Sequence, residues 1–232
     1  MRVDIAANDP SGTAISVDGP VEFLPGDMII PGDISSAAYF IAAAILLPDS
    51  ELKIENVGLN PTRAEFLNVL RSVGASVETS DSHNERNEPV GTVAVHGGFS
   101  KTGGRSRLAG EVIPSLIDEL PLLAVVGTQF TGGIEISNAS ELRHKETDRL
   151  KATAQNLRAM GARVEESEDG LLIDGPTKLR AARIESFGDH RIAMAFSIAG
   201  LIAEGTTEIL GADCVRISFP EFYQLLDQIV EN

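Results

Sequence analysis

The chain has 232 residues, of which 43% are hydrophobic, and a formal net charge of -15 at pH 7. A strongly acidic chain repels nucleic acid and anionic membrane surfaces, so we expect neither as a partner. The single cysteine, Cys214, excludes an internal disulfide framework and a cysteine-cluster metal site, and it fits a reducing compartment. No leader-like segment follows Met1 and no apolar run reaches about 18 residues, which predicts a cytoplasmic protein without a membrane span.

The first residues, 1–24, are rich in turn signals and contain one candidate strand, AISV at 14–17. This pattern is typical of a linker or of the tail of a preceding domain. Residues 25–232 contain the elements of one large domain.

An internal repeat organises that domain. Residues 31–78 and 114–165 share one layout: a capping aspartate, an apolar helix, a short strand, a second helix with a charged start, and a Gly-Ala stop before another strand. A third copy, 188–230, ends early, and we expect it to borrow strands from sequence outside this chain. The three capping aspartates of the repeats are Asp33, Asp118 and Asp189.

Two kinds of helix alternate along the repeats. The first kind is apolar on all sides and must therefore be covered all round. These helices are predicted at 37–46, 120–130 and 192–203. The second kind, at 63–75 and 148–162, has one apolar stripe and fits between a sheet and the surface. With short strands such as 52–57 and 171–175, the sequence predicts an α/β fold in the broad sense, built around a helical core.

The segment ELRHKETDRL, 141–150, predicts a helix that begins with cations. A helix N-terminus carries about half a positive charge, which disfavours Lys145 and Arg149 there, so an anionic ligand is the candidate reason for them. On a helical wheel Glu146 borders the apolar stripe, where partial desolvation and the nearby Arg149 shift its pKa in opposite directions. Glu146 is thus a candidate proton-transfer group. The alternative is a solvated surface with an ordinary Glu146–Arg149 pair.

A second charged start is GDHR, 188–191. Asp189 suits an N-cap, but Arg191 places a permanent cation in the first turn of an otherwise buried helix. Arg63 is the corresponding cation of the first repeat. Arginines at repeat-related helix starts can hold phosphate or carboxylate by forked hydrogen bonds. The alternatives are a salt bridge for Arg191 and a hydrogen-bonded structural histidine for His190.

A third constellation, IPSLIDELPLLA at 113–124, places Asp118 and Glu119 at the start of a buried helix. We expect Asp118 to cap this helix, and a capping aspartate can still act as a base. The chain contains no P-loop, no dinucleotide-binding Gly-x-Gly-x-x-Gly, no His-Glu-x-x-His and no nucleophile elbow. Nucleotide, nicotinamide and zinc chemistry therefore have no support.

Seven motifs stand in order along the chain: PGDISSAAYFIAAA, NVGLNPTR, IPSLIDELPLLA, ELRHKETDRL, EESEDGLLIDG, GDHRIAMAFSIAGL and SFPEFYQLL. Together they resemble the C-terminal half of the EPSP synthase family, the 3-phosphoshikimate 1-carboxyvinyltransferases. The resemblance implies an inside-out, barrel-like α/β domain of repeated β-α-β-α-β-β units with buried helices. The units would be about 25–100, 101–176 and 177–232, the last incomplete.

The resemblance also implies a chemistry: transfer of the enolpyruvyl group of phosphoenolpyruvate to the 5-hydroxyl of shikimate 3-phosphate, with release of phosphate. Asp118 would accept the hydroxyl proton, and Glu146 would deliver a proton to the methylene carbon and later recover one. Lys145 would contact shikimate 3-phosphate, while Arg149 and Arg191 would hold phosphoenolpyruvate. No metal or organic cofactor is implied.

The family's N-terminal half is not represented in this sequence, and it is the implied partner. Residues 1–24 would be the tail of that half, and the chain would form one wall of the active-site cleft and be inactive alone. Ile217 stands where some members of the family carry a lysine, and we leave the adjacent Arg216 outside the predicted site. Two alternatives remain open: a fragment of the related UDP-N-acetylglucosamine enolpyruvyl transferase, and a non-catalytic anion-binding module.

Overall fold

The chain forms two compact units, 1–30 and 31–232. A computed structural model describes residues 3–9, 12–20, 22, 26–27, 29–100 and 104–230. In the first unit β1 (Val3–Asp9) pairs antiparallel with β2 (Gly12–Val17). The candidate strand at 14–17 lies in β2, whereas no sequence signal indicated β1. The predicted domain boundary between residues 24 and 25 lies outside the described residues.

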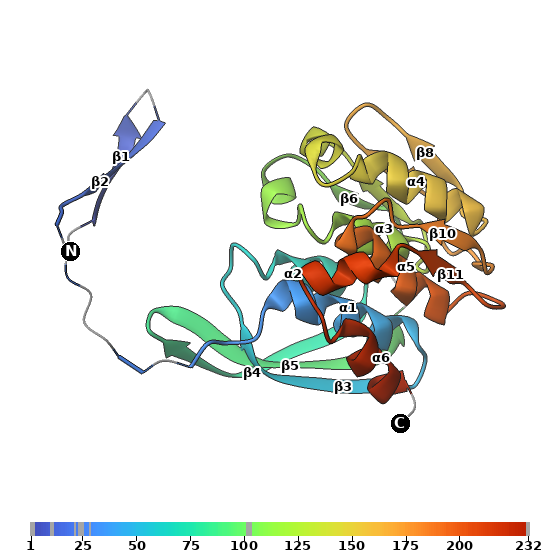
Figure 1. The fold of residues 1–232 in the computed structure, drawn as a ribbon, viewed down its shortest axis with the longest axis horizontal. Coiled ribbons are helices and arrows are strands. Elements are labelled where there is room, and N and C mark those ends of the chain that lie inside the picture. Colours follow the sequence, from blue (N-terminus) through green and yellow to red (C-terminus); the bar gives the residue numbers. More distant parts are fainter. Residues whose placement is uncertain are drawn as a thin grey trace. The chain divides into compact units, whose positions relative to one another are not determined.

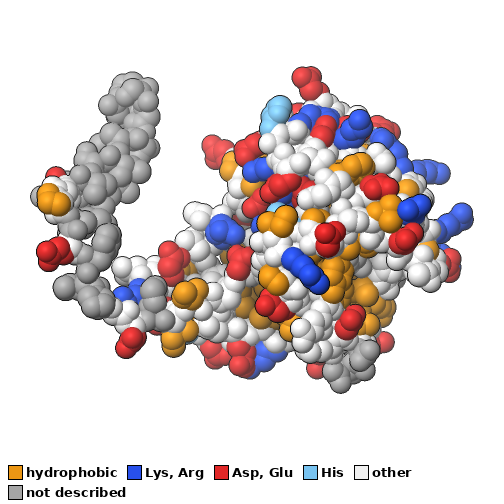
Figure 2. Space-filling view, viewed as in Figure 1, with side chains coloured by type: hydrophobic (Ala, Val, Ile, Leu, Met, Phe, Trp, Pro, Cys, Tyr) orange, Lys and Arg blue, Asp and Glu red, His pale blue; other side chains and the backbone are white. Residues whose placement is uncertain are grey.

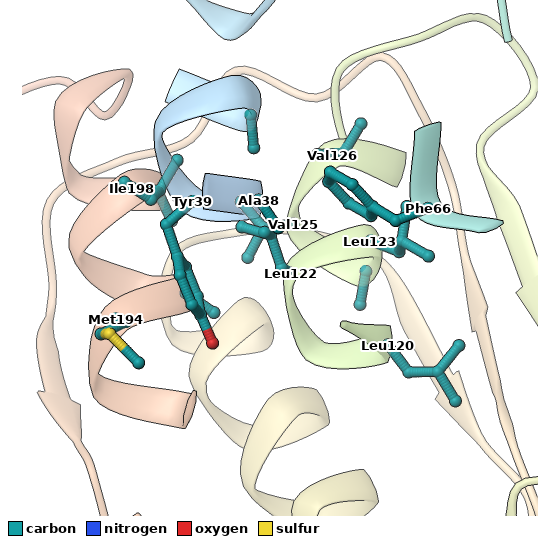
Figure 3. Packing of buried hydrophobic residues seen from close by; sticks show 14 of the residues in the cluster. Ala38, Tyr39, Phe66, Leu120, Leu122, Leu123, Val125, Val126, Met194 and Ile198 are labelled. Atoms are coloured by element: carbon teal, nitrogen blue, oxygen red, sulfur yellow. The ribbon is translucent and has the colours of Figure 1, made fainter. Parts of the chain in front are cut away.

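Three apolar helices form the centre of the second unit. They are α1 (Ile34–Leu46), α3 (Leu120–Gly127) and α5 (His190–Leu201). The three helices contact one another, and all eight residues of α3 are buried. Figure 3 shows their side chains in one cluster, in which Tyr39 of α1 lies between α3 and α5. The prediction of three buried helices is confirmed, because helices without a polar face require cover on every side.

The first two repeats each contain three antiparallel strands in the same order, β3-β5-β4 and β7-β9-β8, and Figure 1 shows the first set side by side. The strands of the first repeat are β3 (Glu51–Gly58), β4 (Ala75–Glu85) and β5 (Glu88–Phe99). Those of the second are β6 (Ser106–Leu108), β7 (Ile134–Ile136), β8 (Val164–Glu166) and β9 (Leu171–Ile173). The equal order shows that the repeat seen in the sequence is a repeat of topology.

A parallel pair also flanks each buried helix. Gly32 bridges Val57 around α1, β6 pairs with β7 around α3, and β10 (Arg183–Glu185) pairs with β11 (Glu208–Leu210) around α5. The third repeat continues with the 3-10 helix η3 (Ala212–Ile217) and α6 (Phe222–Val230). The predicted α/β class with repeated units around buried helices is therefore confirmed.

The amphipathic helices α2 (Glu65–Ser72) and α4 (Arg149–Ala159) pack on β4 and β8 respectively. Their apolar stripes are buried as predicted. Each helix ends shortly before a glycine with a φ of 90°, Gly74 in one repeat and Gly161 in the other. Glycine is the residue that adopts this left-handed conformation at little cost, which explains the repeated Gly-Ala stop.

The start of α4 differs from the prediction. The helix begins only at Arg149, with Asp148 as its N-cap, and residues Ser140–His144 form a separate 3-10 helix, η2. Lys145 and Glu146 lie in the connection between the two helices. The predicted conflict between Lys145 and the dipole of α4 is therefore wrong, because Lys145 lies outside that helix.

The start of α3 also differs. Asp33 and Asp189 cap α1 and α5 as predicted: Asp33 accepts a hydrogen bond from the backbone N–H of Ser36, and Asp189 accepts from those of Arg191 and Ile192. In the second repeat the helix begins one residue later, so that Glu119 takes the N-cap position and makes no side-chain capping bond. The prediction that Asp118 caps this helix is wrong.

Acidic and basic side chains are mixed over the face of the folded unit shown in Figure 2, without one large basic area. Among the described residues no helix is both long and apolar enough to cross a membrane.

Candidate functional site

Arg149, the first residue of α4, is almost completely buried, with a side chain that is 2% exposed. Three carboxylates surround its guanidinium. Nε lies 2.8 Å from Oδ2 of Asp189, Nη1 lies 3.2 Å from Oδ1 of Asp118, and Nη2 lies 2.6 Å from Oε2 of Glu146. A permanent cation at this depth requires such partners, because an unpaired buried charge is very costly.

Arg191, the second residue of α5, is 15% exposed and has longer contacts. Nη2 lies 3.4 Å from Oδ2 of Asp118, and Nη1 lies 3.5 Å from Oε1 of Glu119. The buried Tyr39 hydroxyl lies near this guanidinium: burial raises the pKa of the hydroxyl, and Arg191 opposes that rise. Arg191 is thus paired, but less closely than Arg149.

These contacts join the starts of α3, α4 and α5 into one arginine–carboxylate cluster. Its members are Asp118, Glu119, Glu146, Arg149, Asp189 and Arg191. Exposure increases from Asp189, at 0%, to Asp118, at 36%, and Glu146, at 49%. The cluster therefore has a buried end that fixes Arg149 and a partly open end that carries both predicted proton-transfer carboxylates.

Asp118 is the carboxylate that both arginines share. Burial raises the pKa of its carboxyl, but Arg191, Arg149 and Lys145 together outweigh burial and hold that pKa below its ordinary value. Asp118 is consequently ionised at neutral pH and can accept a hydrogen bond from a hydroxyl. Asp118 does not cap α3, and its side chain pairs with the two arginines instead.

Lys145 and Glu146 reach the cluster from the connection before α4. Nζ of Lys145 pairs with Oε1 of Glu141 at 2.9 Å, and its charge also lowers the pKa of Asp118. Glu146 is the most exposed member of the cluster and contacts Arg149 directly. The wheel-based expectation that Glu146 borders an apolar stripe is wrong, because the residue precedes the helix.

Two further cations of the sequence motifs have other contacts. Arg143 pairs with Asp148 and Glu166 and donates to backbone carbonyls, which ties η2 to β8. Arg63 contacts Asp33 and the Ser35 hydroxyl at the start of α1. Arg143 therefore stabilises the fold locally, whereas Arg63 reaches the neighbourhood of Glu119 through Ser35.

His190, between Asp189 and Arg191, is a largely buried histidine. Burial and the adjacent Arg191 lower its pKa, despite the opposing effect of Asp189. The ring is therefore neutral at neutral pH, and the alternative reading of a structural histidine agrees with this state.

Four of the five predicted site residues, Asp118, Glu146, Arg149 and Arg191, belong to this cluster, whereas Lys145 pairs with Glu141 and affects the cluster through its charge. Arg149 and Arg191 already have carboxylate partners, which agrees with the salt-bridge alternative for Arg191, so an anion must compete with Asp118 or Glu146 for them. The sequence reading also missed two members. Glu119 carried the signal of a second acid beside Asp118, while the Asp189–Arg149 contact spans 40 residues and has no local signal.

Known proteins resemble the chain over nearly its whole length. The family model described as EPSP synthase (3-phosphoshikimate 1-carboxyvinyltransferase) matches residues 1–226. A 3-phosphoshikimate 1-carboxyvinyltransferase of Thermodesulfovibrio yellowstonii is 47% identical over 99% of this chain and 52% of its own length. The EPSP synthase of Acinetobacter baumannii superposes with a TM-score of 0.85 at 31% identity, covering 97% of this chain and 51% of that one.

A more distant structure shows the same fold. The enolpyruvyl transferase NikO from Streptomyces tendae superposes with a TM-score of 0.66 at 21% identity, over 99% of this chain and 49% of that one. The chain spans about half the length of the relatives it matches. Family match, sequence identity and fold agree, and the chain belongs to the EPSP synthase family.

Proposed function

We propose that the protein to which this chain belongs transfers the enolpyruvyl group of phosphoenolpyruvate to the 5-hydroxyl of shikimate 3-phosphate and releases phosphate. The observation that carries the proposal is the convergence of the buried Arg149 and the partly buried Arg191 with Asp118 and Glu146. Both substrates are anions, and the reaction needs proton transfers beside them. The cluster offers cations and carboxylates within hydrogen-bonding distance of each other.

Asp118 accepts the proton of the 5-hydroxyl in this proposal. Its ion pairs with Arg149 and Arg191 keep it ionised before the substrates arrive. When the phosphoenolpyruvate anion binds to the same arginines, their pull on Asp118 weakens and its basicity rises. A general base works best when its pKa lies near the working pH, so substrate binding itself prepares the base.

Glu146 enters this step as the carboxylic acid: it delivers its proton to the methylene carbon of phosphoenolpyruvate as the hydroxyl oxygen attacks the neighbouring carbon, and it is left as a carboxylate. It then recovers a proton as the carbon–oxygen bond to phosphate breaks and the double bond forms again. Its exposure of 49% leaves room for a substrate beside it. The ionised carboxylates also stabilise the positive charge that develops at the reacting carbon.

Lys145 contacts shikimate 3-phosphate, and Arg149 and Arg191 hold phosphoenolpyruvate. Lys145 affects Asp118 electrostatically, which supports a place near the reacting hydroxyl. Arginine is suited to planar carboxylate and phosphate groups because its donors form a rigid fork. We place the reaction in the cytoplasm, in keeping with the single cysteine.

A second polypeptide segment completes the site in this proposal, since the chain spans about half of its relatives. Alignment of two anions in a closed, water-poor site contributes several kcal/mol to catalysis, and one wall cannot supply it. The purified 232-residue chain should therefore show no phosphate release above background. Robust turnover by the chain alone would contradict this part of the proposal.

The decisive test uses the chain together with the complementary half of a relative, as two polypeptides or a fusion. Glu146→Gln keeps the size of the side chain but removes its titratable proton, so kcat should fall roughly 10²- to 10⁴-fold with KM changed far less. Glu165→Gln, an exposed glutamate of β8, is the matched control and should leave the rate unchanged. A near-normal kcat for Glu146→Gln, or turnover of UDP-N-acetylglucosamine instead, would overturn the assignment.

A further inference from the structure

Glu119 occupies the N-cap position of α3, yet its side chain makes no capping bond there. Asp33 and Asp189 do cap the other two buried helices. A glutamate at a helix start is ordinarily solvated, whereas Glu119 is only 5% exposed. Its carboxylate must therefore be stabilised by groups outside its own helix.

Those groups belong to other helix starts. Oε1 of Glu119 lies 3.5 Å from Nη1 of Arg191 in α5, and the Ser35 hydroxyl in α1 is a neighbouring group that lowers the pKa of the Glu119 carboxyl. The same hydroxyl accepts a hydrogen bond from Nη2 of Arg63 at 2.9 Å. Arg63, Ser35, Glu119 and Arg191 are thus successive neighbours in one line of polar groups.

Arg191 consequently has two kinds of partner. Glu119 and Tyr39 are buried and are fixed by the packing around them. Asp118 is 36% exposed, is shared with Arg149, and exchanges its proton in the proposed reaction. Only the buried partners can keep the guanidinium in place while Asp118 and the substrates change their contacts.

We propose that Glu119 is a positioning residue, which with Ser35 holds the Arg191 guanidinium in the orientation that binds phosphoenolpyruvate. The identity of that anion rests on the proposed function. Glu119 itself touches no reacting atom; it acts through Arg191.

The charge of the Glu119 carboxyl depends on its burial and on the polar and charged groups around it. Burial raises the pKa of its carboxyl, and the Ser35 hydroxyl, Arg191 and Arg63 oppose this rise, while Asp118 adds to it. Tyr39 of α1 is the other titratable group beside it. Because burial prevails, Glu119 loses its negative charge on acidification earlier than an exposed glutamate does.

Steady-state kinetics of the chain combined with the complementary half of a relative distinguish a positioning role of Glu119 from a purely structural one. Glu119→Gln keeps the shape and an oxygen for Ser35 but removes the charge facing Arg191. KM for phosphoenolpyruvate should rise roughly tenfold, with kcat and KM for shikimate 3-phosphate within about threefold of wild type. Ser35→Ala should act in the same direction more weakly. Glu111→Gln, an exposed glutamate of the 3-10 helix Gly110–Ser115, is the matched control and should have no effect.

The pH profile gives a second readout that a structural role would not move. At acid pH the wild-type Glu119 is itself protonated. The ratio of KM for phosphoenolpyruvate in Glu119→Gln to that in the wild type should therefore shrink towards one as pH falls. A ratio that is constant with pH, or an equal loss in all kinetic constants, would overturn the proposal.

A readout independent of turnover uses the 232-residue chain with ¹⁵N-labelled arginine. Glu119→Gln should move the Nε–H resonance of Arg191 more than that of Arg149, and should weaken the response of Arg191 to inorganic phosphate. Suppose that the wild-type chain, combined with the complementary half, lacks turnover while Glu119→Gln still moves the Nε–H resonance of Arg191. The proposed function then fails, and the positioning of Arg191 by Glu119 stands. If the Arg191 resonance is indifferent to Glu119, the positioning proposal fails even in an active enzyme.

Discussion

Arg149 and Arg191 stand in the first turns of two helices of different kinds, the amphipathic α4 of the second repeat and the apolar α5 of the third, and the structure holds them differently. Arg149 is 2% exposed and has three carboxylates at 2.6–3.2 Å. Arg191 is 15% exposed and has two carboxylates at 3.4 and 3.5 Å. The same sequence feature, an arginine in the first turn of a helix, therefore leads to a closed ion-pair network in one repeat and to a looser arrangement in the next.

The difference indicates that the two arginines have different main roles. The innermost partner of Arg149 is Asp189, which is fully buried and also caps α5, so this ion pair joins two helices of the core. Of the two carboxylate partners of Arg191, Glu119 is 6% exposed and Asp118 is 36% exposed. We expect Arg149 to matter first for folding and Arg191 first for anion binding, and the following changes test this contrast.

The largest effect should follow Arg149→Met. The change leaves Asp189 buried without its cation, and breaking one side of a buried pair costs about 3–5 kcal/mol. Urea unfolding measures the loss. If the variant does not fold, Asp189→Asn provides the measurement, since asparagine still caps α5 but loses the charge–charge contact. A loss below about 1 kcal/mol in both variants would show that the network is not structural.

Arg191→Met should cost less stability, about 1–3 kcal/mol, because its contacts are longer and the buried Glu119 can take up a proton instead of remaining charged. Phosphate binding by the chain should be lost in this variant. Titration with inorganic phosphate, followed by NMR, measures that binding beside the urea experiment. Equal stability losses for the two arginine variants would break the comparison.

The three buried helices were predictable, since an apolar surface all round a helix leaves only one environment for it. The convergence of Asp118, Arg149 and Arg191 followed from the family resemblance rather than from local signals. The Arg149–Asp118 and Arg191–Asp118 contacts span 31 and 73 residues. Contacts this far apart in the chain cannot be predicted from the periodicity of one helix.

The two helix starts were mispredicted for a physical reason. Charges at 141–148 have a helical spacing, but Asp148 competes as a better N-cap and accepts from the backbone N–H of Lys151, so α4 begins later. Asp118 has the sequence position of a cap, but its ion pairs with two arginines hold it elsewhere. In both cases a side-chain contact outweighed the local pattern.

A smaller effect is expected for Tyr39→Phe. The change removes the buried hydroxyl that lies near Arg191 but keeps the ring packed edge-on against Phe222, so the stability loss should be about 0.5–1.5 kcal/mol. Tyr223→Phe is a matched control, because its hydroxyl contacts Ser197 instead of the cluster. Both variants should have a slightly lower Tm than the wild type, but only Tyr39→Phe should weaken phosphate binding. Equal phosphate affinity in the two would remove Tyr39 from the support of Arg191.

The smallest effect concerns the two adjacent acids, whose pH dependences should have opposite signs. The pKa of Asp118 is lowered in the fold, so its contribution to stability is present above the ordinary aspartate value, about 3.9, and is lost as pH falls through the lower folded value. The pKa of Glu119 is raised, so stability instead declines as pH rises from the ordinary glutamate value, about 4.3, through the higher folded value.

Solvent screening keeps the contribution of Asp118 below about 1 kcal/mol, because a third of its side chain is exposed. Urea unfolding across this acid range should therefore show a shallower acid loss in Asp118→Asn and no decline above the ordinary glutamate value in Glu119→Gln. The slope of unfolding free energy against pH is compared with the wild type in each variant. A change of the same sign in both would mean that both acids act as one shared partner of Arg191. Changes of opposite sign would separate the carboxylate that exchanges from the carboxylate that holds the arginine in place.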